Sequence, residues 1–386
     1  MRVLVSSTSG HGHVLPMVPL AQAVQAAGHQ VLWALAADAR PLVSDAGLTT
    51  APSGPTRAET DRMREKILLG MGDVAPEDRG SYVFPRLFGG DRVPPMVADL
   101  LPLARAWRPD LLVHEMGELA APLVGDLLGV PHVSHAFGGA NPSAQLEAAA
   151  AGLAGLWRSQ GREVPPYAGA FEHLYLDICP PAVQTVPMTH IARRQPLRPG
   201  TYAGPRHLDV RSLLDDGTGR PLVYLTLGTV QNRAPLFREI LGAVAALDVR
   251  VLVTLGPGAD PSALDPQPPD VRVEAYVPQS AVLPHTDAVV SHAGSGTVLA
   301  VLAHGLPQLC LPQAADQFRN ADGVERAGAG IRLSPHEATP AAVAEGVRRL
   351  LAEPELASAA RRVGAEIAAM PSPEEVVGVL EGLVRS

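Results

Sequence analysis

The chain has 386 residues, 46% of them hydrophobic, and a formal net charge of −8 at pH 7. This length predicts two domains with sizeable cores, and the acidic balance argues against a nucleic-acid partner because no basic field is present. The two cysteines, Cys179 and Cys310, form neither a C-x-x-C pair nor a metal-binding spacing, so we expect a reducing, cytoplasmic setting. Polar residues begin at Ser6, too early for a secretory leader, and no apolar run approaches the roughly 20 residues of a spanning helix. We therefore expect no stable membrane insertion.

The first 36 residues predict a strand–helix–strand unit. Residues 3–5 are a short apolar run typical of a buried parallel strand, and residues 6–13 form a turn of small residues. Pro16 suits the first turn of a helix that ends at Gly28, and residues 31–36 are the next strand. This order is the unit of a doubly wound sheet. The turn lacks the third glycine of G-x-G-x-x-G, which argues against an NAD enzyme.

Residues 52–106 are less regular, and order returns after Pro109. The charged run 56–66 predicts either a solvated helix or a mobile loop. We then expect a strand at 111–113, a helix at 119–128, a strand at 130–133, a helix at 145–157 and a loop-rich stretch at 159–190.

A shift in composition marks the domain boundary. Residues 193–220 hold several prolines and glycines and many charges, which indicates a linker. Strand–helix alternation restarts at residue 222. We therefore predict an N-terminal domain over 1–200, a linker over 201–219 and a C-terminal domain over 220–372, with helices at 340–351, 355–369 and 373–384 closing the chain.

The most informative stretch is 276–331. A buried strand at 288–291 runs into a glycine-rich turn and then into an apolar helix at 298–304. Such a turn is an anion site, because small residues let backbone N–H groups approach phosphate oxygens and the helix dipole favours negative charge. A second strand, 308–311, leads to Pro312 and to a helix that opens near Asn320.

This stretch resembles the nucleotide-sugar signature of the family 1 glycosyltransferases. The family shows P-Q, S-H-x-G-x-G-T, G-x-P and P-x-x-x-D-Q-x-x-N-A, and each element is present here. The likeness is greatest to bacterial enzymes that decorate macrolides, enediynes and aromatic polyketides. It implies an α/β fold of the GT-B type, with two Rossmann-like doubly wound parallel-sheet domains facing a cleft. It also implies that the C-terminal helix, 373–386, packs back on the N-terminal, acceptor-binding domain.

The resemblance assigns a donor-binding role to each part of this stretch. It places the nucleotide base on the backbone of Val277 and Gln279, the diphosphate on a histidine and a run of N–H groups, and the sugar hydroxyls on two polar side chains. The residues are Val277, Gln279, His292, Gly294, Ser295, Gly296, Thr297, Asp316 and Gln317, with Gly228 and Thr229 matching a second phosphate-facing turn. The alternatives are a core role for His292 and a helix cap for the Asp316–Gln317 pair.

One departure from the family bears on the donor. Plant relatives carry a glutamate, which bonds both ribose hydroxyls, at the position of Ala300. A buried carboxylate facing a sugar without its 2′-hydroxyl would lack a partner, which costs free energy. Alanine therefore favours a dTDP-sugar over a UDP-sugar, although simple packing also explains it. No D-x-D pair is present, so we expect no metal and no cofactor besides the nucleotide sugar.

The catalytic base is predicted in the first turn. An alcohol must lose its proton as it attacks the sugar, and a histidine is suited to receive it. Residues 12–16 resemble the family motif G-H-x-x-P, which implies that His13 is the base, with His11 as a competitor. The family places an orienting carboxylate where Glu115 stands. His114 or Asp110 could take that role, and Glu115 could instead cap the helix at 119.

The acceptor pocket is predicted from residues 52–106 and 138–185. Its candidate aromatic residues, each of which could also be core, are Phe84, Phe88, Phe137, Trp157, Phe171 and Tyr175. The predicted function is inverting transfer of a sugar to a hydrophobic natural-product aglycone. A nucleotide-sugar 2-epimerase or a non-catalytic auxiliary homologue stays open, as does a homodimer.

Overall fold

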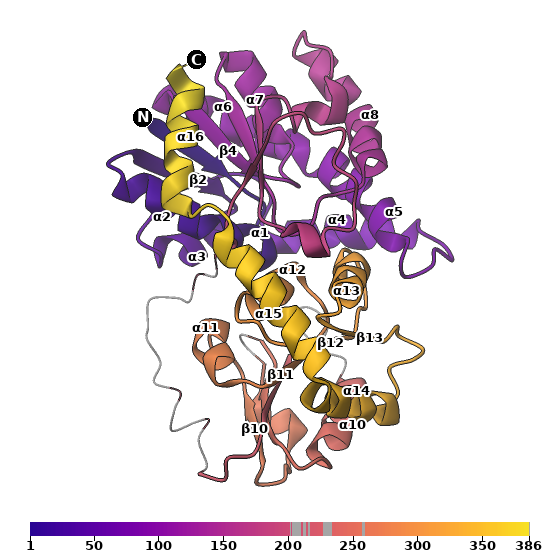
Figure 1. The fold of residues 1–386 in the computed structure, drawn as a ribbon. Helices are drawn as coiled ribbons and strands as arrows, with labels where there is room; N and C mark the ends of the chain where they lie inside the picture. Colours follow the sequence, from indigo (N-terminus) through magenta and orange to yellow (C-terminus); the bar gives the residue numbers. More distant parts are fainter. Residues whose placement is uncertain are drawn as a thin grey trace. The chain divides into compact units, whose positions relative to one another are not determined.

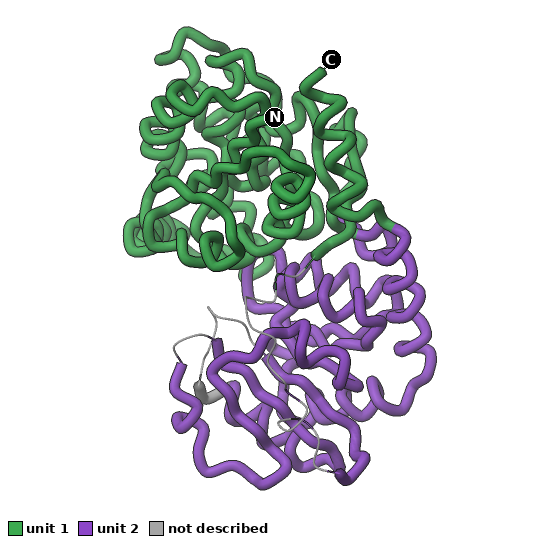
Figure 2. Tube along the Cα trace, turned by 90° about the vertical axis from the view of Figure 1, so that its left-hand side faces the viewer, with its two compact units in different colours: residues 1–179, 186–202, 370–386 green, residues 180–185, 203–369 purple. Residues whose placement is uncertain are grey.

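The computed structural model describes residues 1–200, 202, 210, 214, 217–226, 234–256 and 259–385. They form two compact units, shown in Figure 2. Unit 1 comprises Met1–Cys179, Val186–Tyr202 and Met370–Ser386, and unit 2 comprises Pro180–Thr185 and Ala203–Ala369. Most of the linker predicted at 201–219 lies outside the described residues.

Within the described residues, unit 1 contains a seven-stranded parallel sheet in the order β3-β2-β1-β4-β5-β6-β7. Its strands are β1 (Arg2–Ser6), β2 (Gln30–Leu35), β3 (Thr49–Pro52), β4 (Leu111–Glu115), β5 (His132–His135), β6 (Leu174–Asp177) and β7 (Arg194–Pro196). Every residue of β4 and β5 is buried, as expected for inner strands of a covered parallel sheet. Strand order reverses between β1 and β4, where ligands bind in open α/β sheets.

Helices connect these strands (Figure 1). They are α1 (His11–Val14), η1 (Leu15–Met17), α2 (Val18–Ala26), η2 (Ala37–Ala39), α3 (Arg40–Ser44), α4 (Arg57–Leu69), α5 (Arg79–Arg86), η3 (Leu87–Asp91), α6 (Val93–Trp107), α7 (Ala120–Leu128), α8 (Ser143–Ser159), η4 (Pro166–Gly169) and α16 (Pro373–Arg385). The charged run at 56–66 forms α4, which Thr56 opens with a capping box to Glu59.

The last helix, α16, belongs to unit 1. It lies beside α2, and His29 Nε2 is 2.9 Å from Glu381 Oε1. The preceding segment is fixed as well, because Arg198 N–H donates to Pro371 O at 2.8 Å. The chain therefore returns to unit 1 at Met370, after leaving it near residue 202.

Unit 2 contains a six-stranded parallel sheet in the order β10-β9-β8-β11-β12-β13, again counting only described residues. Its strands are β8 (Leu222–Thr226), β9 (Arg250–Thr254), β10 (Val271–Glu274), β11 (Ala288–Ser291), β12 (Gln308–Cys310) and β13 (Gly330–Arg332). The order repeats that of unit 1, so the equivalent switch point lies between β8 and β11.

Unit 2 includes a short segment, residues 180–185, that interrupts the sequence of unit 1. The helices of unit 2 that the structure describes start in this segment. They are η5 (Pro181–Val183), α10 (Ala234–Ala245), η6 (Pro261–Leu264), α11 (Gln279–Val282), η7 (Leu283–His285), α12 (Ser295–Ala303), α13 (Gln317–Arg326), α14 (Pro340–Ala352) and α15 (Pro354–Ala369). Residues 180–185 pack closely on α13, where a Cβ at Gly323 would lie 2.3 Å from Val183 O. Residues 180–185, which we assigned to the N-terminal domain, thus belong to unit 2.

Candidate active site

The central feature of unit 1 is a histidine–carboxylate pair at the switch point of the sheet. β1 ends at Ser6 and the chain turns into α1, which carries His13. The neighbouring strand β4 ends at Glu115. His13 Nδ1 lies 3.1 Å from Glu115 Oε2, with the imidazole 23% exposed and the carboxylate fully buried. One ring nitrogen therefore faces a carboxylate, which is the arrangement of an oriented general base.

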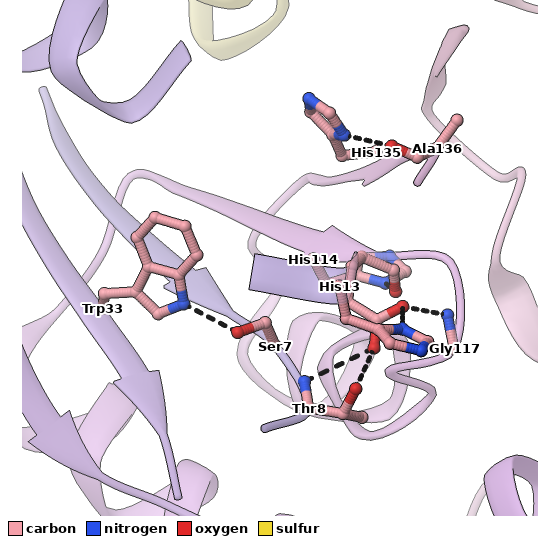
Figure 3. Close-up of polar contacts among 9 residues, drawn as sticks. Ser7, Thr8, His13, Trp33, His114, Gly117, His135 and Ala136 are labelled. Atoms are coloured by element: carbon pink, nitrogen blue, oxygen red, sulfur yellow. Dashed lines mark hydrogen bonds and ion pairs between the residues drawn. The ribbon is translucent and has the colours of Figure 1, made fainter. Parts of the chain in front are cut away.

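The Glu115 carboxylate is held by Thr8, His13 and Gly117, which Figure 3 labels. Thr8 donates to Oε1 from its hydroxyl at 2.7 Å and from its backbone N–H at 3.3 Å, and Gly117 N–H donates to Oε2. Burial alone would raise the pKa of Glu115, but His13 and these hydrogen bonds outweigh burial and lower it. The group is therefore an ionised carboxylate at neutral pH.

Two glycines make room for this pair. A Cβ at Gly10 would lie 2.9 Å from His13 Cδ2, and one at Gly117 would lie 2.8 Å from the Phe88 ring and 3.1 Å from Glu115 Oε2. The distances of 2.9 Å to His13 and 2.8 Å to Phe88 are shorter than carbon atoms tolerate without movement of a neighbour. The local sequence thus fixes the imidazole and the carboxylate through the absence of side chains beside them.

Aromatic rings surround the His13 imidazole. The centroid of Phe88 is 5.5 Å from that of His13 in a stacked arrangement, and the centroid of Phe137 is 4.5 Å away. Phe84 packs on Phe88 at 5.1 Å. Three of the predicted acceptor residues therefore gather at the predicted base, and Phe88 and Phe137 remain partly exposed.

The other predicted acceptor aromatics lie elsewhere. Trp157 is 1% exposed on the inner face of α8, and Tyr175 is 1% exposed on an inner strand. Phe171, 8% exposed, packs edge-on against Tyr175 at 5.4 Å. The enclosed Trp157 indole packs in the unit 1 core, so we leave it out of the acceptor surface that we propose below.

The structure separates Glu115 from the alternatives. Asp110 accepts from Arg2 N–H at 2.6 Å, at the opposite end of the strands. His114 points to the other face of β4, where burial and His132 lower its pKa to about 3. The helix at 120 is capped by Glu118, which accepts from Ala120 N–H at 2.7 Å, and not by Glu115. His11 begins α1, and burial and Arg57 lower its pKa.

Two buried charged residues beneath the pair were not predicted. Arg92 is 5% exposed, lies over the Phe88 ring at 5.2 Å, and interacts electrostatically with Glu115 and Glu118. Burial raises the pKa of Glu118 to about 7, with a smaller contribution from Glu115. Glu118 could have been predicted as a helix-capping residue, because it stands two positions before the apolar helix α7. Arg92 gave no such signal, because it lies in an irregular stretch.

The turn of unit 2 is built differently. β11 ends at Ser291, and His292 precedes α12, whose N-cap is Gly294. Ala293 has a φ of 61°, a left-handed conformation that is uncommon for alanine and turns the backbone into the helix start. A Cβ at Gly294 would lie 2.5 Å from His292 Nε2. Burial lowers the pKa of His292, which favours the neutral imidazole.

A polar network joins this turn to α13. Asp316 Oδ2 accepts from the Ser295 hydroxyl at 2.6 Å and from the Asn320 amide at 2.9 Å. The same amide reaches Ala293 O at 2.9 Å. Asn320, which we expected only to open a helix, therefore holds the strained turn in place. Its signal was its place in the family pattern.

The remaining donor residues lie around the same turn. Gln279 donates to Thr297 Oγ1 at 3.0 Å, whereas Gln317 Oε1 accepts from the N–H groups of Gln313 at 2.8 Å and Ala314 at 3.0 Å. Val277 is buried, whereas its neighbour Tyr276 is 53% exposed. Gly296 is exposed at the helix start. Gly228 and Thr229 lie outside the described residues.

Ala300, the departure from the family pattern noted above, is buried in unit 2. It is 5% exposed and packs in one cluster with Tyr224, Val277 and Val289. A glutamate at this position would have to leave that cluster or carry its charge into it.

Among the described helices, none is long and apolar enough to cross a membrane.

Both parts of the chain match the domains of a known protein family. The family described as "Erythromycin biosynthesis protein CIII-like" matches with its N-terminal domain over residues 22–204 and its C-terminal domain over residues 238–383. The chain belongs to this family. The L-demethylnoviosyl transferase of Streptomyces niveus is 34% identical over 100% of this chain and 99% of that protein.

Solved structures of similar proteins cover the whole fold. Glycosyltransferase VinC in complex with dTDP has a TM-score of 0.82 at 28% identity and covers 100% of both chains. Spinosyn rhamnosyltransferase SpnG with spinosyn aglycone has a TM-score of 0.81 at 28% identity and covers 99% of this chain and 100% of its own. This member of the erythromycin CIII-like family is therefore a GT-B glycosyltransferase of the antibiotic-biosynthesis type, as the first turn and residues 276–331 predicted.

Proposed function

We propose that this enzyme transfers a sugar, with inversion at the anomeric carbon, from a dTDP-sugar to a hydroxyl of a hydrophobic natural-product aglycone. His13 is the general base in this proposal, and Glu115 orients it. The observation that carries the proposal is the 3.1 Å contact between His13 and the buried Glu115 carboxylate, beside the partly exposed Phe88 and Phe137. Family membership supports glycosyl transfer as the reaction, and the His13–Glu115 pair supports removal of the acceptor proton by a histidine.

The proton has a defined route in this scheme. Because Nδ1 of His13 faces Glu115, Nε2 is the nitrogen that accepts the proton of the acceptor hydroxyl. The acceptor oxygen forms its bond to the anomeric carbon while the bond from that carbon to the diphosphate breaks. The imidazolium that results is stabilised by the ionised Glu115. Phe88 and Phe137 offer apolar surface to an aglycone next to the base.

The leaving diphosphate belongs to unit 2 in the same scheme. Gly294 to Thr297 begin α12, whose free N–H groups and dipole favour negative charge. His292 would donate a hydrogen bond to a phosphate oxygen, and Asp316 and Gln317 would bind sugar hydroxyls. No metal takes part in this proposal, because these groups stabilise the developing charge themselves.

A dTDP-sugar is favoured over a UDP-sugar for two reasons. Ala300 offers no carboxylate to a ribose 2′-hydroxyl, and the similar protein VinC was solved with dTDP. Calorimetric titration of the purified chain with dTDP and with UDP tests this directly. Clearly tighter binding of UDP would overturn the donor assignment.

The transfer itself is tested with a dTDP-sugar and a panel of aglycones, read by mass spectrometry. We expect a product that gains one sugar, with inverted anomeric configuration by NMR. Donor consumed without aglycone, and yielding an isomerised sugar, would indicate the epimerase. Nucleotide binding without any product across the panel would favour an auxiliary protein.

A further inference from the structure

We infer that unit 1 contains a second site, a binding site for a divalent transition-metal ion of the zinc class, formed by His132, Glu172 and His173. His132 begins β5, and Glu172 and His173 directly precede β6. The two strands are parallel neighbours with Val133 opposite Leu174, so their amino-terminal ends bring the three residues together. His13 and Glu115 lie at the carboxyl ends of their strands, which is the other edge of the sheet.

The side chains of this cluster, His132, Glu172 and His173, already converge. One ligand atom from each lies within 4.8 Å of the other two. His132 Nε2 is 3.6 Å from Glu172 Oε2, and the rings of His132 and His173 meet edge to face at 4.6 Å. Imidazole nitrogens with a carboxylate oxygen are the ligands that zinc prefers.

The His132 imidazole lacks partners for its polar atoms. It is 1% exposed, and within the part of the chain that the structure describes neither ring nitrogen has a hydrogen-bond partner. The carboxylate at 3.6 Å is too distant for a hydrogen bond. A neutral imidazole has one donor and one acceptor, and burying both unsatisfied is costly. An ion at Nε2 would satisfy one of them.

The three ligands differ in how firmly they are held. His132 is enclosed, with its ring 5.5 Å from that of His114 and its Cδ2 3.1 Å from where a Cβ at Gly125 would lie. The Glu172 side chain is 50% exposed, and His173 is partly exposed. Zinc bonds of about 2.0–2.2 Å bring ligand atoms to roughly 3.3 Å from one another. Glu172 and His173 are free to make that small movement toward a fixed His132.

This ion would stabilise the fold of unit 1 while keeping one coordination position open. It would join the start of β5 to the segment between η4 and β6, away from the His13–Glu115 pair. Three protein ligands leave a fourth position for water, as in open zinc sites. Binding to the folded chain would raise its stability in proportion to the free ion concentration.

The test uses the full chain, freed of any histidine tag and stripped with a chelator, titrated with Zn²⁺ by calorimetry. We expect one ion per chain, a rise in Tm with added Zn²⁺, and visible absorption of tetrahedral Co²⁺ when cobalt replaces zinc. His173→Ala and Glu172→Gln change partly exposed residues and should fold. Each should weaken Zn²⁺ binding at least tenfold and lose the cobalt spectrum.

Matched controls change a histidine and a glutamate outside the cluster. His285→Ala and Glu163→Gln, both at exposed positions, should bind Zn²⁺ as the unaltered chain does. The inference is overturned if the unaltered chain shows no saturable binding, or if His173→Ala binds Zn²⁺ equally well. A loss of Tm in Glu172→Gln without any metal binding to the unaltered chain would show that His132 and Glu172 form an ion pair only.

Discussion

The turns that follow β1 and β11 share one local unit, to which our proposal gives two different roles. Each is a buried parallel strand, a turn with glycine and histidine, and a helix. In unit 1 the helix, α1, has four residues, and His13 lies 3.1 Å from a carboxylate on the neighbouring strand. In unit 2 the helix, α12, has nine residues, and the partly buried His292 follows a strand whose neighbours end in Thr226 and Cys310.

The difference shows that the neighbouring strand decides what the histidine can do. A carboxylate beside an imidazole stabilises the protonated ring, so His13 can take a proton. In our proposal, the partly buried imidazole of His292, beside the start of a longer helix, stays neutral and donates a hydrogen bond to an anion. Sequence similarity between the two turns alone would not distinguish these roles.

The largest effect should come from removing the base. His13→Ala should lower turnover by roughly 10²–10⁴, because no other imidazole faces a carboxylate in that turn. His11→Ala, its neighbour, should lower turnover only a few-fold. Steady-state rates with a dTDP-sugar and an accepted aglycone measure both, and a larger loss in His11→Ala would reassign the base.

Removing the charge that orients the base should have the next largest effect. Glu115→Gln keeps the size of the side chain but loses the negative charge, so turnover should fall by roughly 10²-fold. Glu163→Gln serves as the control for the same chemical change at an exposed position. Turnover in Glu115→Gln within twofold of the unaltered enzyme would show that the pair is only structural.

The sequence predicts the strands that are apolar runs, whereas other strands depend on contacts with residues far away in the sequence. Strands such as β8 and β11 were readable because they are continuous apolar runs. β7 and β13 were missed because neither is an apolar run: β7 begins with arginine and glutamine, and in β13 a single isoleucine stands between glycine and arginine. Their place as strands is set by pairing with a neighbour.

The site divides in the same way. His13, Glu115, His292 and Asp316 were predicted because the family motifs include them. Thr8 was not, because its bond to Glu115 spans 107 residues of sequence. The sequence could not tell whether Trp157, which the structure encloses in the core, contacts the acceptor, since an aromatic residue in a helix has the same pattern in a core and in a pocket.

Unit 1 should also respond to pH through Glu118. Its pKa is about 7 in the folded chain against 4.5 in the free side chain. This contribution to stability is therefore fully present below about pH 4.5 and is lost as the pH rises through about 7. Glu118→Gln should remove up to about 3 kcal/mol of that pH dependence.

Urea unfolding at pH 5 and pH 8 measures this loss. The three tryptophans, Trp33, Trp107 and Trp157, all lie in unit 1, so their fluorescence reports that unit. The buried His114 and His135, whose pKa values burial lowers to about 3 and about 4, are common to both proteins and cancel. An equal fall in stability from pH 5 to pH 8 in both proteins would refute the role of Glu118.

The smallest effect should appear at the start of α12. Gly294→Ala places a Cβ 2.5 Å from His292 Nε2 and must displace the imidazole or the turn. We expect dTDP affinity to fall about tenfold, which is about 1.4 kcal/mol. Gly242→Ala, on α10 with no atom near the added Cβ, should bind dTDP normally. Equal affinities would place the diphosphate elsewhere.

The division of labour between the two histidines is tested most directly by titrating dTDP into the unaltered chain, His13→Ala and His292→Ala. Our account predicts that His13→Ala binds dTDP with unchanged affinity, whereas His292→Ala binds it at least tenfold more weakly. Weaker binding in His13→Ala together with normal binding in His292→Ala would contradict it.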